Sequence, residues 1–261
     1  MTTIDTVDIR QVDLQPKVKR TDAIQSFVVQ ETVLVTLHCS DGSVGTGYTY
    51  TIGTGGSSIV ALLHDHLAPL LIGRDPAGYE AIWRDLFFHT HATAVGAITS
   101  LALAAIDTAL WDRNTRVANL PLWVAAGGSK PRTRTYSTEG GWLHLSEAEL
   151  VDQTLQARDA GFHGAKIKVG RPHLAEDTRR LTAVRDAMGD DFEIMVDANQ
   201  GFTLSEAIRR ANAFEPLRLA WLEEPMPAEN IAAHQRLCAA SSVPIAVGES
   251  TVSYTHLTLP T

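Results

Sequence analysis

The second half of the chain repeats one pattern, in which a short apolar run is followed by an amphipathic segment. The apolar runs lie at about 133–138, 163–168, 192–197, 218–223 and 244–249, and segments with helical periodicity separate them at about 146–160, 174–188, 204–214 and 229–240. Strands that alternate with helices predict a parallel sheet, because a connection between parallel strands needs a crossover long enough to hold a helix. This pattern restricts the second half of the chain to an α/β fold.

The apolar runs from the second to the fifth share another property, because each passes into a charged residue that Gly, Asn or Pro soon follows. Their ends read GAKIKVG, IMVDANQG, LAWLEEP and PIAVGES. In a parallel α/β barrel, the C-terminal ends of the strands form the active-site face. We therefore expect five charged side chains to point toward one place: Lys166, Lys168, Asp197, Glu223 and Glu249.

The three acidic residues of this set follow one another at the interval of one strand–helix unit. The steps from Asp197 to Glu223 and from Glu223 to Glu249 are 26 residues each. Three carboxylates that converge repel one another and are costly to desolvate, and a divalent cation offsets both effects. Oxygen ligands with room for water suit Mg²⁺, with Mn²⁺ as a substitute. The spacing therefore predicts a metal site on Asp197, Glu223 and Glu249.

Two lysines accompany the predicted metal site. Lys166 and Lys168 are two residues apart on one strand, so their side chains face the same side. The pKa of a lysine falls beside a metal and a second cation, and the neutral amine can then act as a base. Such a base suits removal of the weakly acidic proton α to a carboxylate, because the metal stabilises the charge that develops on the carboxylate oxygens.

The first half of the chain has a mixed pattern. The stretch VLVTLHCSDGSVGTGYTYTI holds two β-rich runs around Asp41-Gly42, which predicts a hairpin. Apolar helical patterns follow at about 58–71, 76–88 and 94–116, and the last of these is almost wholly apolar before Asp107, which predicts a buried helix. The glycine-rich stretch at 125–132 is typical of a linker. We expect an α+β domain over 1–128 and an α/β domain over 129–251.

Composition excludes several classes of partner. The net charge of −8 and the pI near 5.6 argue against nucleic acid or an anionic membrane as a partner. The sequence contains no apolar run approaching the ~20 residues that cross a bilayer, and its polar, acidic start is unlike a signal peptide. Two widely separated cysteines, Cys39 and Cys238, form neither a disulfide framework nor a zinc motif, so we expect a cytoplasmic protein.

Five motifs, AIDTALWD, KIKVG, VDANQG, WLEEP and VGES, occur in this order and spacing. Together they resemble the enolase superfamily and, within it, the mandelate racemase/muconate lactonizing group. The resemblance implies that residues 1–128 form a capping domain and that 129–251 form part of a modified TIM barrel of the (β/α)₇β type, with about five of its eight strands. It also implies a homo-oligomer, and it places Mg²⁺ on the same three acidic residues.

The resemblance assigns further roles at the predicted site. It makes Lys168 the base, Lys166 its electrostatic partner near the substrate carboxylate, and Asn199 a contact of the substrate at the edge of the site. Superfamily sites of this kind combine a lysine or histidine base with Mg²⁺ that stabilises an ene-diolate. Loops near 17–30 and 50–57 are expected to cover the substrate, a small-molecule carboxylate.

The stretch from Arg171 to Gln200 resembles, in particular, the acid-sugar dehydratases of this group that act on galactarate or talarate. We therefore expect dehydration of an acid sugar or hydroxy acid. A racemase, epimerase or cycloisomerase of the same superfamily is an alternative reaction. A non-catalytic scaffold or binding protein is an alternative of another class, although a scaffold has no need of two lysines and three acids at the strand ends.

Several other polar residues have structural explanations. The histidines of each pair, His64/His66 and His89/His91, are two residues apart. Residues at this spacing do not share a helix face, so we expect surface or core histidines rather than metal ligands. We expect a structural role for His38, which lies in a strand. Glu224 points away from Glu223 and is expected either to be structural or to support the site from behind, and Asp107 and Asp112 are expected to make capping or packing contacts. The run from Gly53 to Gly56 lacks the parallel strand and lysine of a phosphate loop, which favours a mobile lid segment.

The last ten residues, VSYTHLTLPT, resemble the translation of a sequencing-library adapter. We therefore expect Val252–Thr261 to be a non-native tail and the chain as written to be inactive. In the family, later strands of the barrel bring a second catalytic group, often a histidine paired with an aspartate. A divergent but genuine C-terminus is the alternative.

Overall fold

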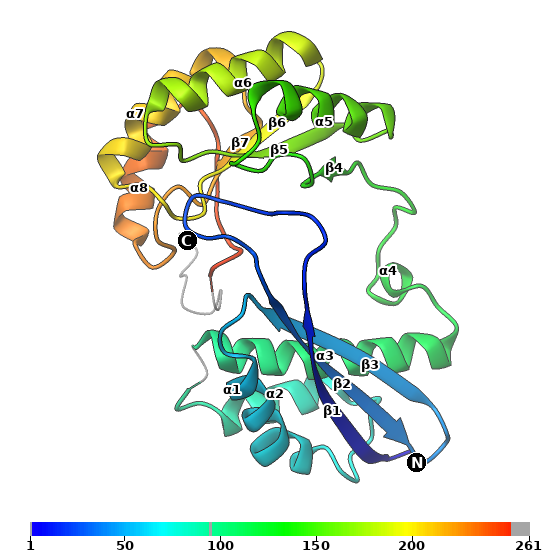
Figure 1. Ribbon diagram of the computed structural model, residues 1–261. Coiled ribbons are helices and arrows are strands. Elements are labelled where there is room, and N and C mark those ends of the chain that lie inside the picture. The colour runs from blue at the N-terminus through cyan, green and yellow to red at the C-terminus, as the bar shows by residue number, and fades with distance from the viewer. Residues whose placement is uncertain (1, 94–95, 252–261) are drawn as a thin grey trace. The chain divides into compact units, whose positions relative to one another are not determined.

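The structure, a computed structural model, describes residues 2–93 and 96–251 (Figure 1). These residues form two compact units. The first holds the chain up to Lys17 and from Val28 to Pro131, and the second holds Val18–Phe27 and Arg132–Thr251. The domain boundary expected between residues 128 and 129 stays a prediction, although the units divide only three residues later.

The first unit contains an antiparallel sheet in the order β1 (Ile4–Leu14), β2 (Gln30–Cys39) and β3 (Val44–Thr51). The predicted hairpin is present, because β2 and β3 pair in register on either side of Gly42, whose φ of 79° suits glycine. Strand β1 was not predicted. It is an edge strand in which Ile4 is buried, and Val7 and Ile9 are half-buried. The alternation changes phase between Ile9 and Val12, and the register is irregular between Ile4 and Thr6, so the strand signal in the sequence is weak.

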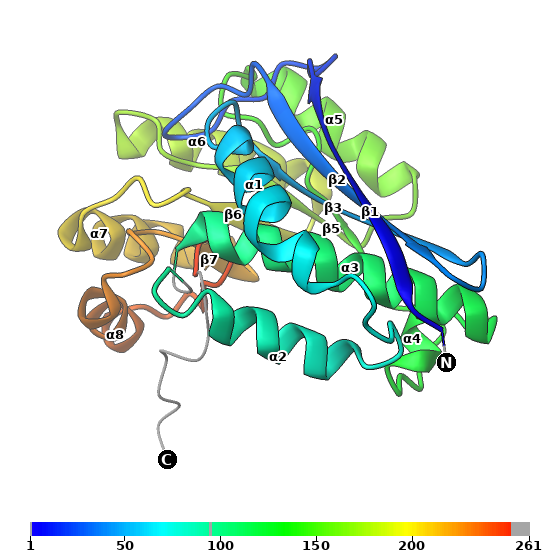
Figure 2. The same ribbon diagram turned by 90° about the horizontal axis from the view of Figure 1, so that it is seen from below.

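Helices cover one face of this sheet (Figure 2). They are α1 (Gly56–Leu62), continued by a π turn and a 3₁₀ turn to Leu70, and α3 (Ala97–Ala118). Helix α2 (Tyr79–His89) and the short α4 (Leu122–Ala125) pack on α3. Helix α3 is buried, as predicted, and packs on β3. Gly47 makes this contact possible, since a Cβ atom there would lie 2.0 Å from the Ala105 carbonyl oxygen.

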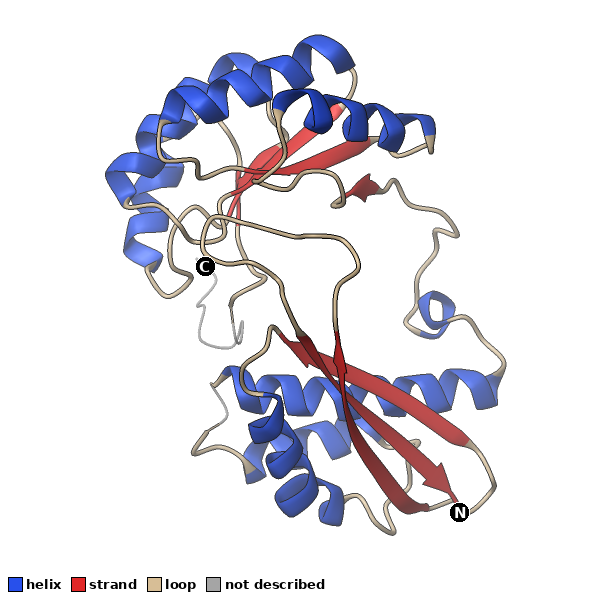
Figure 3. Cartoon of the chain, in the orientation of Figure 1, coloured by secondary structure: helices blue, strands red, loops and turns tan. Residues whose placement is uncertain are grey.

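The second unit contains a parallel sheet in the order β4-β5-β6-β7-β8, which confirms the α/β class (Figure 3). The strands are β4 (Tyr136–Ser137), β5 (Gly164–Lys168), β6 (Glu193–Asp197), β7 (Trp221–Glu223) and β8 (Ile245–Ala246). The helices α5 (Glu147–Asp159), α6 (Leu174–Met188), α7 (Leu204–Phe214) and α8 (Ile231–Ala240) lie along one side of the sheet, and a 3₁₀ turn (Glu215–Leu217) follows α7.

The two-residue alternation of the strands separates the core of this unit from its polar face. Ile167, Val196 and Leu222 are fully buried in the apolar core beneath the helices. The neighbouring residues Lys166 and Asp197 therefore face the opposite side of the sheet. Helix α5 begins at a capping box, in which Ser146 and Glu149 satisfy each other's backbone N–H groups.

Three further expectations concern the whole chain. In the part of the chain that the structure describes, no helix is long and apolar enough to cross a membrane. Cys39 and Cys238 are both free thiols. The predicted non-native tail, 252–261, lies outside the described residues.

The contact between β3 and α3 yields a prediction about stability. Gly47→Ala should lower the free energy of unfolding of the first unit by about 3 kcal/mol or more, because the new methyl group overlaps helix backbone that cannot rotate away. Gly42→Ala is the matched control: its Cβ meets no atom within 4 Å, so only the left-handed backbone costs energy, about 1–2 kcal/mol. Urea unfolding of both variants tests this, and an equal loss would contradict the packing explanation.

Candidate functional site

Three neighbouring strands bring the predicted acidic residues together. Asp197 is the last residue of β6 and pairs in register with Glu223, the last residue of β7. Glu249 comes from the loop three residues beyond β8. One carboxylate oxygen from each of the three lies within 4.8 Å of the others. The geometry therefore assembles the group that the spacing predicted.

The two predicted lysines lie against these carboxylates. Lys166 Nζ is 2.8 Å from Glu223 Oε1 and 3.1 Å from Asp197 Oδ2. Lys168 Nζ is 2.7 Å from Asp197 Oδ2 and donates a hydrogen bond of 2.8 Å to Asn199 Oδ1. The backbone N–H of Asn199 donates in turn to Asp197 Oδ1, at 2.9 Å. All six predicted site residues thus belong to one cluster.

Charge pairing controls the protonation of the cluster. Burial disfavours the charged form of Lys166, but its contacts with Glu223 and Asp197 outweigh burial and raise its pKa above the ordinary value. Burial likewise opposes ionisation of Asp197, yet the charges of Lys168 and Lys166 lower its pKa. The sequence predicted that a lysine pKa would fall beside a metal. In this structure the pKa of Lys166 is raised instead, because the carboxylates themselves pair with the lysines.

Glu249 differs from the other two acids. Glu249 is exposed as a residue, but its carboxyl group is partly surrounded by protein atoms, and this burial raises its pKa. Within the described chain, no hydrogen bond or ion pair involves its side chain, whereas Asp197 and Glu223 both pair with lysine. The three carboxylates therefore outnumber the two ammonium groups beside them.

This donor set fits a divalent cation. It offers oxygen atoms only, from three different strands, and it carries one negative charge more than the lysines neutralise. Oxygen ligands of this kind suit Mg²⁺ or Mn²⁺ better than Zn²⁺, which favours nitrogen and sulfur. Across residues 2–93 and 96–251, no second group of three His, Cys, Asp or Glu residues is arranged to hold a metal.

Two tryptophans that were not predicted contact the site. Trp221 Nε1 donates to Glu223 Oε2 at 3.0 Å, and the Trp142 ring lies 5.7 Å from Lys168 Nζ, within the range of a cation–π contact. Trp221 was detectable, because it lies two residues before Glu223 on the same strand face. Trp142 lies in a loop after β4, and no local pattern connects it with Lys168.

The segment Val18–Phe27 belongs to the same compact unit as the parallel sheet. The ring of Phe27 packs edge-on against Trp142 at 5.8 Å. The Thr21 carbonyl oxygen accepts from the backbone N–H of Leu143 at 3.0 Å, and Arg20 pairs with Glu139. The segment that was expected to cover the substrate is therefore anchored through the loop that carries Trp142, while its covering role stays a prediction.

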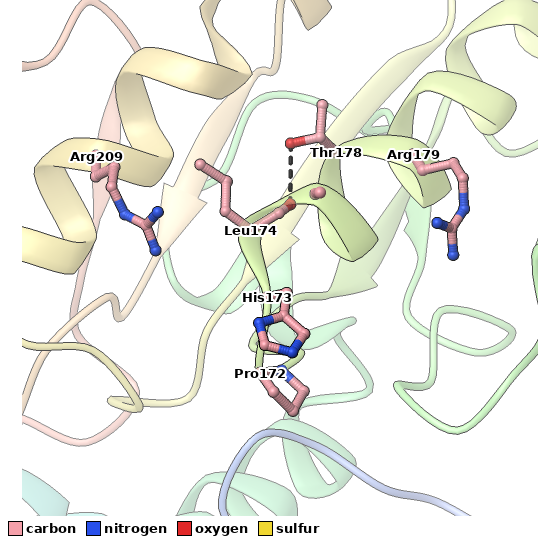
Figure 4. A pocket seen from close by; sticks show the side chains of 7 residues that line it. Pro172, His173, Leu174, Thr178, Arg179 and Arg209 are labelled. Atoms are coloured by element: carbon pink, nitrogen blue, oxygen red, sulfur yellow. Dashed lines mark hydrogen bonds between the residues drawn. The ribbon is translucent and has the colours of Figure 1, made fainter.

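A surface hollow at the start of α6 has basic residues along its border (Figure 4). His173, Arg179 and Arg209 border it, but both guanidinium groups already pair with carboxylates, Arg179 with Glu147 and Arg209 with Glu206. Thr178 Oγ1 is also engaged, since it donates to the Leu174 carbonyl oxygen. The hollow therefore offers little free positive charge to a ligand.

The residues interpreted as structural behave largely as expected. His64 pairs with the adjacent Asp65, and His38 lies 3.2 Å from Asp8. Asp112 accepts from the backbone N–H of Thr46 at 2.9 Å. Asp107 is half-buried between two hollows on α3, and burial raises its pKa. The run from Gly53 to Gly56 was expected to be a mobile lid segment; its last two residues, Gly55 and Gly56, begin helix α1, and the lid role stays a prediction.

Comparison with known proteins places these features in a family. Residues 5–127 match the family described as mandelate racemase/muconate lactonizing enzyme, N-terminal domain, and residues 149–258 match the family described as enolase C-terminal domain-like. The chain therefore belongs to the mandelate racemase/muconate lactonizing enzyme family of the enolase superfamily.

Two curated relatives are enzymes that the chain resembles in sequence. The chain is 37% identical to an L-talarate/galactarate dehydratase of Salmonella typhimurium, over 85% of this chain and 56% of the relative. It is 38% identical to a 3,6-anhydro-alpha-L-galactonate cycloisomerase of Streptomyces coelicolor, over 84% of this chain and 61% of the relative. The chain thus spans less than two thirds of the length of either enzyme.

Solved structures give the same family. The Salmonella dehydratase, solved with Mg and L-lyxarohydroxamate, superimposes with a TM-score of 0.89 at 34% identity, over 95% of this chain and 65% of that one. A racemase from Streptomyces coelicolor, solved with bound magnesium, gives a TM-score of 0.91 at 35% identity, over 95% of this chain and 70% of that one. The predicted Mg²⁺ agrees with the metal of these structures and with the donor set.

The carboxylate cluster yields a prediction about cation binding. Mg²⁺ or Mn²⁺ should raise the thermal unfolding temperature of the chain, since binding to the folded state adds about 2.7 kcal/mol at 100 times the dissociation constant. Asp197→Asn and Glu249→Gln should each abolish the increase. Glu193→Gln is the matched control, because Glu193 lies at the opposite end of β6 and should leave the increase unchanged. An increase of the same size in all four proteins would place the cation elsewhere.

Proposed function

We propose that the protein represented by this chain removes the proton α to the carboxylate of an acid sugar or hydroxy acid and then eliminates the β-hydroxyl group. The observation that carries the proposal is the cluster of two lysines and three acids at the C-terminal ends of adjacent parallel strands. The same reasoning supports a small-molecule carboxylate as the partner, and a homo-oligomer stays a prediction.

The residues of this chain have distinct tasks in the proposed reaction. Asp197, Glu223 and Glu249 would hold Mg²⁺, which when bound supplies positive charge to the oxygens of the ionised substrate. Lys168 Nζ, held by Asn199 Oδ1, would take the α-proton as a neutral amine. Lys166, nearly buried beside Glu223, would attract the substrate carboxylate.

The proposed dehydration passes through an enediolate intermediate. Lys168 takes the α-proton, and the electron pair of the C–H bond passes to the substrate carboxylate as an enediolate. The enediolate then expels the β-hydroxyl group, which takes the proton from the Lys168 ammonium group and leaves as water, so that Lys168 is neutral again. The resulting enol becomes a 2-keto acid. Racemisation and epimerisation share the first step and instead return a proton to the α-carbon.

The relatives support dehydration but also name a second candidate. The Salmonella enzyme is a dehydratase, and the Streptomyces enzyme of nearly equal identity is a cycloisomerase. Both types of reaction suit a lysine base that lies opposite the carboxylate of a bound substrate. A non-catalytic scaffold is less well supported, because burying two lysines among acidic groups is costly and gives a scaffold no function.

The role of the base can be tested through proton exchange. A version of the chain continued beyond Ser250 with the corresponding segment of the Salmonella dehydratase should exchange the substrate α-proton with deuterated solvent. Lys168→Met should slow this exchange at least ~100-fold on the face that the lysine serves, because a positioned base contributes roughly that much. Substrate binding should persist. Exchange at the unchanged rate would mean that another group is the base.

Lys166→Met should behave differently from Lys168→Met. It removes the ammonium group proposed to attract the substrate carboxylate, so it should weaken substrate binding as well as slow the reaction. Calorimetric titration with a non-reacting hydroxamate analogue measures the first effect. Unchanged binding by the Lys166 variant would overturn its proposed role.

Substrate class and reaction type need a separate measurement. We expect a panel of acid sugars, incubated with the continued protein and Mg²⁺, to yield 2-keto acids, detected by semicarbazone absorbance. Galactarate and talarate belong in the panel, and lactones test the cycloisomerase alternative. A product with unchanged mass and no keto group would favour isomerisation, and no product from any member would favour a binding protein.

A further inference from the structure

One buried carboxylate links the loops that follow the metal-site strands. Glu224 lies directly after β7 and is only 3% exposed. Its Oε1 atom accepts a hydrogen bond of 2.6 Å from the backbone N–H of Ser250, and its Oε2 atom accepts one of 2.9 Å from the Ser250 hydroxyl group. Ser250 directly follows Glu249, so Glu224 holds the residue beside the third acid of the cluster.

Gln200 extends the link to the loop after β6. Its side-chain Nε2 donates to the Ser250 hydroxyl oxygen at 2.9 Å, and its Oε1 accepts from the backbone N–H of Ala228 at 2.8 Å. Its own backbone N–H donates to the Glu224 carbonyl oxygen at 2.6 Å. The loops after β6, β7 and β8 are therefore joined by hydrogen bonds that converge on Glu224 and Ser250.

The backbone of these loops is unusual. Asn199, Gln200 and Glu224 have φ angles of 43°, 65° and 37°, which residues other than glycine seldom adopt. Such conformations persist where the surrounding structure fixes them, and they are found at functional sites. At Glu224 the turn directs the side chain to Ser250, whereas the side chain of Glu223 contacts Lys166.

The three acids differ in how their positions are fixed. Asp197 and Glu223 are strand residues paired in the sheet, and side chains hold both: Lys168 contacts Asp197, and Trp221 contacts Glu223. Glu249 lies beyond the end of β8 and follows Gly248, whose φ is 142°. No described side chain forms a hydrogen bond or ion pair with its carboxylate, so the nearest hydrogen bonds along the chain are those of its neighbour Ser250.

We propose that Glu224 is a positioning residue for the cation site, which sets Glu249 at ligand distance by holding Ser250 through two hydrogen bonds. This inference rests on the proposed function only in that Asp197, Glu223 and Glu249 bind a divalent cation. Groups that orient metal ligands commonly change metal affinity 10- to 100-fold when they are removed.

Titration of the 261-residue chain with Mn²⁺, followed by the electron paramagnetic resonance signal of the free ion, tests the proposal. Glu224→Ala should weaken Mn²⁺ binding roughly 10- to 100-fold. Glu224→Gln loses the charge but keeps the shape and two hydrogen-bonding atoms, so it should recover most of that loss. Ser250→Ala keeps the charge of Glu224 but loses both hydrogen bonds of the hydroxyl group, to Glu224 and from Gln200, and should weaken binding roughly 3-fold or more.

Ser241→Ala is the matched control. Ser241 also makes two hydrogen bonds with nearby backbone, to Val243, but it lies before β8 rather than after it. Its removal should lower the unfolding temperature without changing Mn²⁺ affinity. Unfolding temperatures of all variants, measured beside the titrations, separate loss of affinity from loss of folded protein, and Ser250→Ala provides the test if Glu224→Ala does not fold.

Two outcomes would overturn the proposal, and they differ from failure of the proposed function. In the first outcome, Ser250→Ala binds Mn²⁺ as tightly as the unchanged chain does, while Glu224→Ala and Glu224→Gln lose Mn²⁺ affinity equally. This result would show that only the charge of Glu224 matters. Unchanged affinity in every variant would show that Glu224 does not position a ligand. If the unchanged chain itself bound no Mn²⁺, the cation site of the proposed function would fail, and this inference with it.

Discussion

The pairing of two lysines with three carboxylates is the interaction on which the rest of the site depends. Lys166 and Lys168 are largely withdrawn from water, and they are tolerable there only because Asp197 and Glu223 lie within about 3 Å of them. The same carboxylates repel one another, and Glu249 adds a charge that no lysine contacts in the described structure. A divalent cation bound by the three acids would complete this balance and would link the stability of the cluster to its chemistry.

The parallel sheet makes the pairing possible. Alternation along β5 buries Ile167 under the helices and turns Lys166 and Lys168 to the other face. In-register pairing of β5, β6 and β7 then places Lys168, Asp197 and Glu223 side by side. Repetition of one strand–helix unit thus converts a regular spacing in sequence into a cluster in space, and Glu224 and Ser250 bring in the one acid that the sheet does not hold.

Much of this could be predicted from the sequence, because period-two alternation and strand-end charges are local signals. Each of the five parallel strands and the hairpin around Gly42 came from such signals, as did the meeting of the three acids. Strand β1 escaped prediction because the alternation of this exposed edge strand changes phase between Ile9 and Val12 and is therefore short. The contacts of Trp142 with Lys168 and of Glu224 with Ser250 escaped it because they join loops distant in sequence, and tertiary packing alone decides such contacts.

Anomalous diffraction from crystals of the chain grown with Mn²⁺ would show whether the three acids bind a divalent cation. We predict a single strong anomalous peak bonded to carboxylate oxygens of Asp197, Glu223 and Glu249, with Lys166 and Lys168 released from the oxygens that the cation takes. A peak at any other group of residues would contradict this prediction. So would an empty cluster in which both lysines keep their ion pairs while Mn²⁺ is bound elsewhere.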